Sequence, residues 1–459
     1  MTHRYAVLGG GVLGLTVALR LAQRGHQVTV FEREARPGGL AAGFRVGTEP
    51  GAADDVWLDK FYHHLFTSDK AVTGLIHELG MGNELLWRRP LTVTLRGGKV
   101  YQLASPTPVL RFKPISLPAR LRLGAVLGYL RLLPSPNSLE GRTAAAWLRH
   151  AMGRAAYDAV FAPLFKGKFG ALADEIAMPW FWARIHDRTA RLGYVRGGFQ
   201  RFYNRLAGRI GELGGTLLLE TQVQSVERDG EGWAVTYGEV LTPRPPLPAG
   251  RGGGGEQPAQ PQRQTFDRVV STLPTRLTCR LVPQLPADYR ARYEWGTAYG
   301  AHCLIMALDR SVLPGGAYWM NVNDPGFPFM VAVEHTHYMP AADYGGQTLV
   351  YLGNYRPMDD PLFGMSQQQV LDDFLPHLRR INPAFEPQWV TRSWMFAAPF
   401  AQPIVTREYR EHIPPFDTPL TDLWVANMFQ VYPHDRGQNY SVDLAERLVK
   451  HLDAQDRDK

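Results

Sequence analysis

YAVLGGGVLGLTVALRLAQRGHQVTVFERE, residues 5–34, is the stretch that decides the fold. The apolar run over 4–9 predicts a buried strand, and the run over 27–32 predicts a second strand. Between them, apolar residues from about Val12 to Arg24 repeat with helical spacing. Strand, glycine turn, helix and strand in this order predict a βαβ unit of a parallel sheet, and therefore an α/β domain.

The turn between the first strand and the helix has the G-x-G-x-x-G spacing, at Gly9, Gly11 and Gly14. Gly9 is expected to make the tight turn, Gly11 to let the backbone approach a pyrophosphate, and Gly14 to let helix and strand pack closely. The pyrophosphate is expected at the first N–H groups of the helix, near Val12 and Leu13. Together with the strands, this turn predicts a Rossmann-like dinucleotide-binding domain.

The second strand ends at Glu32, a carboxylate expected to accept hydrogen bonds from both hydroxyls of a ribose that has no 2′-phosphate. Residues 32–41, EREARPGGLA, resemble the E-x-x-x-R-x-G-G run of the flavin-containing amine oxidase superfamily. That superfamily includes protoporphyrinogen oxidases, carotenoid-type desaturases and, more distantly, UDP-galactopyranose mutases. The resemblance implies a non-covalently bound FAD whose pyrophosphate and ribityl chain lie along this run. The residues implied are Arg33, Arg36, Gly38, Gly39 and Leu40.

Further segments follow in the order that this superfamily shows. Residues 193–199 and the helix expected over 200–211 resemble the segment that re-enters the FAD domain. The resemblance implies that the backbone of Val223 meets the adenine and that Thr272 lies near the pyrophosphate. Residues 423–428 resemble the family's last strand, but Asn427 stands near where the family has an acid.

The polar run before the last expected helix, DRGQNYS over 435–441, resembles the final wall of a flavin site. Asn439 is a good N-cap type. The first N–H groups of the helix, near Tyr440 and Ser441, would stabilise negative charge on a reduced flavin. Asp435 is a candidate for the missing carboxylate, and an ordinary capped terminal helix is the alternative.

Few residues are candidates for catalysis or for substrate binding. His63 and His64 follow the Gly-Gly loop and would lie beside the flavin, or they are packing histidines. Lys168, in a turn expected over 163–170, is the candidate for holding a water at the flavin. Three further residues, among aromatics, suit a large and partly anionic substrate, or form a solvated helix face with core tryptophans: Trp182, Arg184 and Arg188. His335 and His337 lack a partner ligand, so no metal is expected.

Charge and composition limit which functional classes and cellular locations remain. The 459 residues carry 50 Lys and Arg against 43 Asp and Glu, a net charge of +7, without a basic block typical of nucleic-acid binding. Two cysteines, no signal peptide pattern and no long apolar run favour a cytoplasmic protein. The basic amphipathic stretch 117–133 suits either peripheral contact with a membrane or a substrate-domain helix with solvated arginines. The partner expected is a small-molecule substrate; the oligomeric state stays open.

The resemblance also divides the chain. An FAD-binding domain is expected from 1–75, 192–280 and 415–459, interleaved with a mixed α+β substrate domain from 76–191 and 281–414. Residues 241–264, rich in Pro, Gly and Gln, predict a disordered insertion in a hairpin of that first domain.

These expectations lead to one favoured function. It is an FAD-dependent oxidoreductase of the amine oxidase and protoporphyrinogen oxidase type, removing hydride from a C–N or C–C unit of a bulky organic substrate. The alternatives are a non-redox sugar-nucleotide mutase like UDP-galactopyranose mutase, an isoprenoid desaturase, and a flavin-bound scaffold without catalysis.

Overall fold

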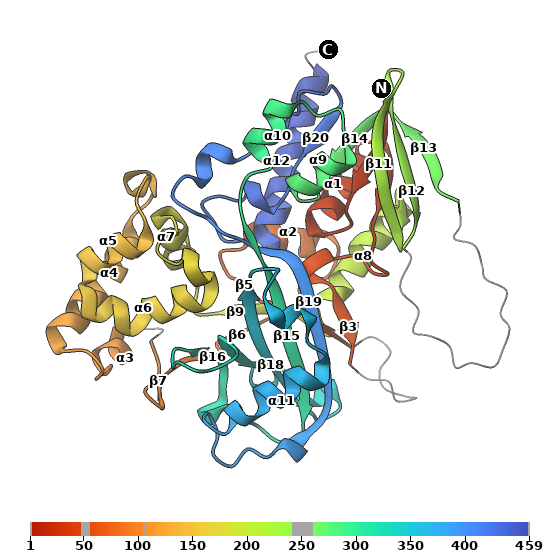
Figure 1. Ribbon diagram of the computed structural model, residues 1–459. Helices are drawn as coiled ribbons and strands as arrows, with labels where there is room; N and C mark the ends of the chain where they lie inside the picture. The colour runs from red at the N-terminus through yellow and green to blue at the C-terminus, as the bar shows by residue number, and fades with distance from the viewer. Residues whose placement is uncertain (1, 47–55, 104–105, 241–259, 458–459) are drawn as a thin grey trace.

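A parallel five-stranded sheet confirms the predicted βαβ unit (Figure 1). The computed structural model describes residues 2–46, 56–103, 106–240 and 260–457. The strands run in the order β10 (Thr216–Leu218), β2 (Gln27–Phe31), β1 (Arg4–Leu8), β14 (Arg268–Ser271) and β20 (Leu423–Val425). Side chains of β1 alternate: Tyr5 and Val7 join the core under the helices, while Ala6 and Leu8 face the opposite core. Helices α8 (Phe199–Glu212) and α12 (Gln438–Arg457) pack against α1 (Val12–Gln23).

An antiparallel sheet of β11 (Thr221–Asp229), β12 (Gly232–Glu239) and β13 (Gln262–Phe266) covers the other face of that sheet. β12 and β13 form the predicted hairpin, with Trp233 opposite Phe266. The predicted insertion lies outside the described residues over 241–259. Its predicted end at 264 is wrong, because residues 262–264 already pair in β13.

A second, seven-stranded sheet forms the lower half of Figure 1. Its order is β19 (Val390–Pro403), β15 (Ala298–Leu308), β18 (Thr348–Arg356), β17 (Val331–Glu334), β16 (Ala317–Val322), β7 (Leu91–Arg96) and β8 (Lys99–Tyr101). Helix α11 (Gln367–Leu378) begins with a full capping box between Ser366 and Gln369. The predicted domain boundaries stay a prediction.

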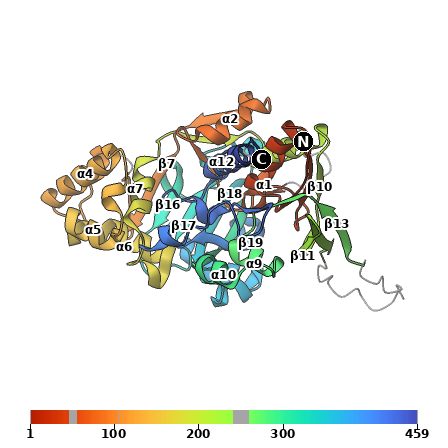
Figure 2. The ribbon, with the colours of Figure 1, turned by 90° about the horizontal axis from the view of Figure 1, so that it is seen from above.

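Five helices form a lobe with its own apolar core, at the left end of both Figure 1 and Figure 2. They are α3 (Pro106–Leu110), α4 (Leu117–Leu132), α5 (Ala144–Met152), α6 (Arg154–Phe169) and α7 (Met178–His186). The turn expected over 163–170 is wrong, because α6 continues through Pro163 to Phe169. Burial of Phe161, Phe165 and Phe169 outweighs the hydrogen bond that the proline cannot make.

Shorter elements join these parts. They are β3 (Gly43–Arg45), β4 (Trp57–Asp59), β5 (Leu65–Phe66), α2 (Lys70–Glu78), β6 (Leu85–Arg88), β9 (Leu192–Val195), α9 (Thr275–Leu281) and α10 (Ala287–Tyr293).

Candidate functional site

The first glycine turn is packed so closely that neither Gly9 nor Gly14 can carry a side chain. A Cβ atom on Gly14 would stand 1.9 Å from the carbonyl oxygen of Gly9, so α1 approaches the end of β1 as the motif predicts. Gly9 has φ +103°, a conformation that L side chains rarely adopt. Thr272 lies against this turn, and its hydroxyl donates to the carbonyl of Leu8 at 2.8 Å.

The two glycine runs lie side by side. The N–H of Gly38 donates to the carbonyl of Gly10 at 2.8 Å, and a Cβ on Gly39 would stand 3.1 Å from the Cα of Gly11. A Cβ on Gly11, in contrast, meets nothing closer than the Cα of Gly39, at 4.0 Å. Beside Gly11, α1 begins without a capping side chain, so its first N–H groups, at Val12 and Leu13, find no side-chain acceptor there. This double backbone cradle fits the pyrophosphate of an extended dinucleotide.

Glu32 is buried at the end of β2 and helps to hold the cradle. One carboxylate oxygen accepts from the N–H of Gly10 at 2.7 Å and the other from the N–H of Glu34 at 2.8 Å. Burial raises the pKa of this carboxyl. Each oxygen keeps a further lone pair, so the predicted contact with ribose hydroxyls is compatible with these bonds.

The remaining predicted cofactor residues of this region are more open. Arg33 is exposed and pairs with Glu34 at 3.0 Å, and the guanidinium of Arg36 lies 4.6 Å from the ring centre of Trp57. Leu40 is half-buried in a short turn after the cradle. Val223 lies on β11 where the ladder with β12 becomes irregular, which leaves its backbone less regularly paired.

Asn427 is buried, and its amide is already bonded within the protein. Its nitrogen donates to the carbonyl of Leu273 and the hydroxyl of Thr275, both at 3.1 Å, and its oxygen accepts from the N–H of Phe429 at 3.0 Å. Both amide hydrogens are therefore used, so Asn427 fixes the loop after β20. A contact with a ribityl hydroxyl would have to use its oxygen.

The last helix begins at Gln438, one residue before the N-cap candidate Asn439. Asn439 is therefore not its N-cap. The amide oxygen of Asn439 instead accepts from the N–H groups of Ala71 at 2.9 Å and Val72 at 3.3 Å, and so caps α2. Only the fold brings these residues together, which is why the sequence pattern assigned the cap to the wrong helix.

Gln438 is the residue at this helix end that sequence reasoning missed. Its side chain is 6% exposed, and neither polar atom of its amide has a partner among the described residues. Neighbouring Tyr440 donates to the carboxylate of Asp187 at 2.8 Å, and Ser441 donates to the carbonyl of Gly437 at 3.1 Å. An unpartnered buried amide at a helix N-terminus indicates a polar ligand at this place.

Just before α12, Asp435 is the centre of an ionic cluster. Its carboxylate pairs with Lys168 of α6 at 3.1 Å and with Arg184 of α7. The indole N–H of Trp180 donates to the same carboxylate at 3.3 Å. The ring of Trp180 also lies 4.9 Å from both Lys168 Nζ and the guanidinium carbon of Arg184. Helix spacing placed Arg184 near Trp180, but nothing in the sequence linked either of them to Asp435.

Arg436 extends the cluster to the second sheet. It donates to the side-chain oxygen of Gln402 on β19 and, at 2.5 Å, to the hydroxyl of Tyr355 on β18. Its guanidinium lies 4.7 Å from the ring centre of Tyr355. The cluster thus joins the helical lobe, the second sheet and the start of α12.

The charges of the cluster are unequal, since three basic side chains face one carboxylate. Burial by itself would raise the pKa of Asp435, but Lys168 and Arg184 hold it well below its usual range. Burial, followed by the charge of Arg184, lowers the pKa of Lys168, against the pull of Asp435. The surplus of basic groups favours a further anion at this place.

The two predicted histidines are neutral at pH 7. Burial, followed by the charge of Arg436, lowers the pKa of His63 to about 4, and its Nδ1 has no partner among the described residues. Burial lowers the pKa of His64 to about 3, and its Nδ1 lies 3.3 Å from the hydroxyl of Tyr318. Neither histidine can therefore supply a full positive charge, although His63 keeps a free ring nitrogen near Arg436.

Trp182 and Arg188 are the other two residues predicted to bind substrate. Trp182 is buried in the lobe, where its N–H donates to the carbonyl of Leu133 at 3.0 Å, and its contact with a substrate stays a prediction. Arg188 is exposed, 6.0 Å from the ring centre of Phe66.

Among the described residues no group of three His, Cys, Asp or Glu could hold a metal. His335 bonds to Tyr344, and His337 pairs with Glu334.

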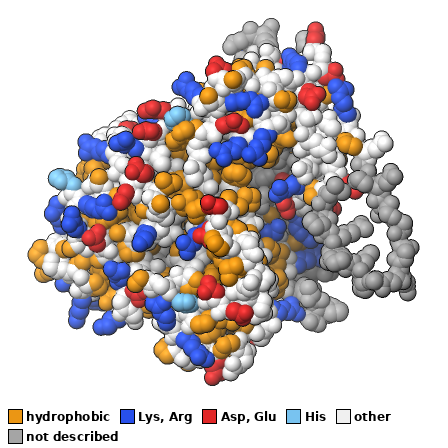
Figure 3. Space-filling model, in the orientation of Figure 1, with side chains coloured by type: hydrophobic (Ala, Val, Ile, Leu, Met, Phe, Trp, Pro, Cys, Tyr) orange, Lys and Arg blue, Asp and Glu red, His pale blue; other side chains and the backbone are white. Residues whose placement is uncertain are grey.

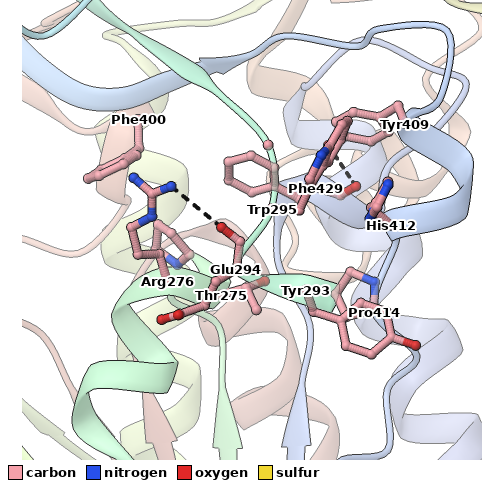
Figure 4. Close-up of a pocket in the computed structure, with 12 residues that line it drawn as sticks. Thr275, Arg276, Tyr293, Glu294, Trp295, Phe400, Tyr409, His412, Pro414 and Phe429 are labelled. Atoms are coloured by element: carbon pink, nitrogen blue, oxygen red, sulfur yellow. Dashed lines mark hydrogen bonds between the residues drawn. The ribbon is translucent and has the colours of Figure 1, made fainter. Parts of the chain in front are cut away.

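An aromatic pocket that opens to solvent lies next to the loop that follows β14, and the space in it, open solvent included, is about 440 Å³ (Figure 4). Trp295 and His412 stack in its wall with ring centres 4.2 Å apart. A second cavity, of about 220 Å³, reaches Asp435 and Arg436 and shares Tyr409 with the first. Tyr409 therefore lines both cavities, and the second one reaches the ionic cluster.

The profile of the family described as Flavin containing amine oxidoreductase matches residues 14–430. Mitochondrial protoporphyrinogen oxidase of Nicotiana tabacum is 26% identical over 197 residues, which are 42% of this chain and 38% of that enzyme. The chain thus matches less than two fifths of that enzyme's length. Reduced UDP-galactopyranose mutase has a similar fold, with TM-score 0.73 and 13% identity over 99% of this chain and 96% of its own. Putrescine oxidase bound to putrescine has TM-score 0.67 and 14% identity, over 99% of both chains.

Proposed function

Since this chain belongs to the flavin-containing amine oxidoreductases and is a flavin-dependent oxidoreductase, we propose that it binds FAD non-covalently and oxidises a bulky organic molecule carrying an anionic group. The step would remove hydride from a C–N or C–C unit of that molecule. When bound, the flavin supplies the two-electron chemistry, and the protein supplies position and electrostatics.

The observation that carries the FAD assignment is the contact between the two glycine runs. Gly38 bonds to Gly10, and Gly11 keeps an open side next to the first turn of α1. Val12 and Leu13 would donate their N–H groups to the pyrophosphate, and Glu32 would bind the ribose. At the far end, the unpartnered amide of Gln438 and the free nitrogen of His63 match a polar ring edge.

The ionic cluster supports an anionic substrate. Lys168, Arg184 and Arg436 outnumber the single carboxylate of Asp435, and the aromatic ring of Trp180 lies among them. Arg436 and Arg184 would orient a carboxylate or phosphate of the substrate. Lys168, whose pKa burial lowers well below its usual range, would exchange a proton or hold a water near the reacting atom.

A direct test mixes the FAD-loaded protein with candidate substrates without oxygen and follows bleaching of the flavin. Each carboxylate should be compared with its amide, and the amide should be slower by roughly 10- to 100-fold, the value of a charged hydrogen bond. Lys168→Met should slow bleaching strongly. Lys166→Met is the matched control, because Lys166 is exposed on the same helix. Equal rates for acids and amides would contradict the anion assignment.

A sugar-nucleotide mutase is the second candidate, because the same basic surplus could bind a diphosphate. The pair suggested by the sequence, Arg184 and Arg188, stays a prediction, although Arg184 already bonds to Asp435. Reduced enzyme that interconverts a nucleoside diphosphate galactose without consuming an electron acceptor would establish this candidate. An isoprenoid desaturase fits less well, since charged side chains surround Asp435.

A further inference from the structure

One side of α4 is apolar although it faces away from the protein. Leu117, Leu121 and Leu132 are 53, 56 and 83% exposed. Their spacing places them on one stripe of the helix together with the exposed Gly124, Ala125 and Gly128. Exposed arginines, Arg122 and Arg131, flank this stripe. The opposite side carries Leu123 and Leu130, which are buried in the core of the lobe. A helix on a water-exposed surface normally turns polar residues outward, so this stripe needs another explanation.

The stripe belongs to a wider apolar surface. Eight large hydrophobic side chains are exposed among the described residues, and six of them lie between positions 100 and 132. These six are Val100, Leu110, Leu117, Leu121, Tyr129 and Leu132. Single exposed leucines are ordinary, but a concentration of this kind marks an interaction surface. We name the surface of β8, α3 and α4 that carries these six side chains the α4 face.

Positive charge is concentrated in the same part of the chain. Residues 85–139 contain nine Lys or Arg and no Asp or Glu, so the rest of the chain has a small negative balance. Five of the nine follow α3 or lie on α4: Arg111, Lys113, Arg120, Arg122 and Arg131. None of these five forms a salt bridge with a described residue. Arg122 and Arg131 donate to backbone carbonyls of α5 and of the end of α7, which leaves their charge unneutralised.

We propose that the α4 face docks on the surface of an anionic phospholipid bilayer. The apolar side chains match the acyl boundary of a bilayer, and the basic side chains that flank them match its anionic headgroups. A protein partner of neutral charge would contact the apolar side chains but would leave the basic ones without counter-charges. No helix among the described residues is long and apolar enough to cross a membrane, so α4 would lie along the surface. The lobe projects at one end of the molecule in Figures 1 and 2, and Figure 3 shows basic and hydrophobic side chains mixed over it.

The test uses the full chain and sedimentation with vesicles. Vesicles containing phosphatidylglycerol should bind the protein, and vesicles of phosphatidylcholine alone should bind it much less. Raised salt should weaken the binding, because headgroup attraction is screened. Arg111→Gln combined with Lys113→Gln should weaken it about 30-fold, at the strength expected for two basic residues near such a surface.

The apolar contribution needs a matched control. Leu121→Gln combined with Leu132→Gln should lower vesicle binding about 10-fold or more. Leu277→Gln combined with Met358→Gln should leave it unchanged, since these exposed residues lie elsewhere in the fold. Equal binding by both double variants would overturn the proposal. A chain dimer that binds no vesicle and dissociates in the Leu121/Leu132 variant would overturn it too, by assigning the face to a second copy.

Discussion

At the scale of single residues, the glycine cradle gives the sharpest prediction. Gly11→Ala should leave the fold and its thermal unfolding temperature unchanged, because the new Cβ meets only the Cα of Gly39, at 4.0 Å. The methyl group would nevertheless occupy the space that a pyrophosphate needs, so the purified variant should lose its flavin. Absorbance of the bound flavin measures this.

Gly74→Ala is the matched control. Gly74 lies exposed on α2, and a Cβ atom added there would have nothing within 4 Å, so this variant should keep its flavin. Its free energy of unfolding should rise by up to about 1 kcal/mol, because alanine favours the helix more than glycine does. Full flavin content in Gly11→Ala would show that the cradle binds nothing.

His302 gives a residue-scale prediction that concerns stability alone. It is 1% exposed on β15, both ring nitrogens lack partners among the described residues, and burial lowers its pKa to about 4. The ring is neutral in the folded protein and takes up a proton on unfolding between pH 6.5 and about 4. Wild-type stability therefore contains a contribution that decreases as pH falls through that window.

His302→Leu should remove this contribution. The free energy of unfolding at pH 7 should rise by about 1–3 kcal/mol, because an unpaired buried polar group is lost. The difference from wild type should grow by up to about 1.4 kcal/mol per pH unit on acidification. Urea midpoints at pH 7 and pH 5 test this. A difference between variant and wild type that shrinks at pH 5 would show that His302 is not held neutral by burial.

At the scale of elements, the cap between α12 and α2 is testable. Asn439→Ala should lower the free energy of unfolding by about 1 kcal/mol, because the N–H groups of Ala71 and Val72 lose their acceptor. Ser441→Ala should cost less, since its hydroxyl bonds only to a carbonyl of its own helix. Urea unfolding of both variants measures the difference. A flavin lost from Asn439→Ala with stability unchanged would restore the cofactor contact first predicted for it.

Elements were predictable from the sequence wherever the signal is local. The βαβ unit, the α11 cap at Ser366 and the helix over 117–132 follow from periodicity and capping residues. The turn expected at Pro163 failed because tertiary burial decides whether a proline is tolerated inside a helix. The start of α12 failed because Asn439 has the capping chemistry but serves another helix.

At the scale of the whole molecule, the ionic cluster connects parts of the chain that no motif links. Lys168 and Asp435 are 267 positions apart, so only the assembled fold could bring them to 3.1 Å. The sequence did predict basic residues among aromatics near Arg184 and suggested a carboxylate at Asp435. It could not predict that they meet, nor that Trp180 rather than Trp182 faces them.

Asp435→Asn should therefore destabilise the molecule as a whole. Removing this carboxylate leaves Lys168, Arg184 and Arg436 facing one another, and the partly buried site should lose about 1–3 kcal/mol. Asp174→Asn is the control: its pair with Arg149 is exposed and should contribute less than about 1 kcal/mol. Urea unfolding of both variants measures the two losses. Equal losses would show that the ionic cluster contributes no more to stability than an exposed ion pair.

The central claim is that the facing glycine runs hold FAD, and one measurement tests it most directly. The purified protein is scanned in the visible range, denatured, and the released cofactor identified. We predict a yellow protein that releases an equimolar amount of FAD on denaturation without proteolysis. A colourless protein that takes up no added FAD would contradict the account.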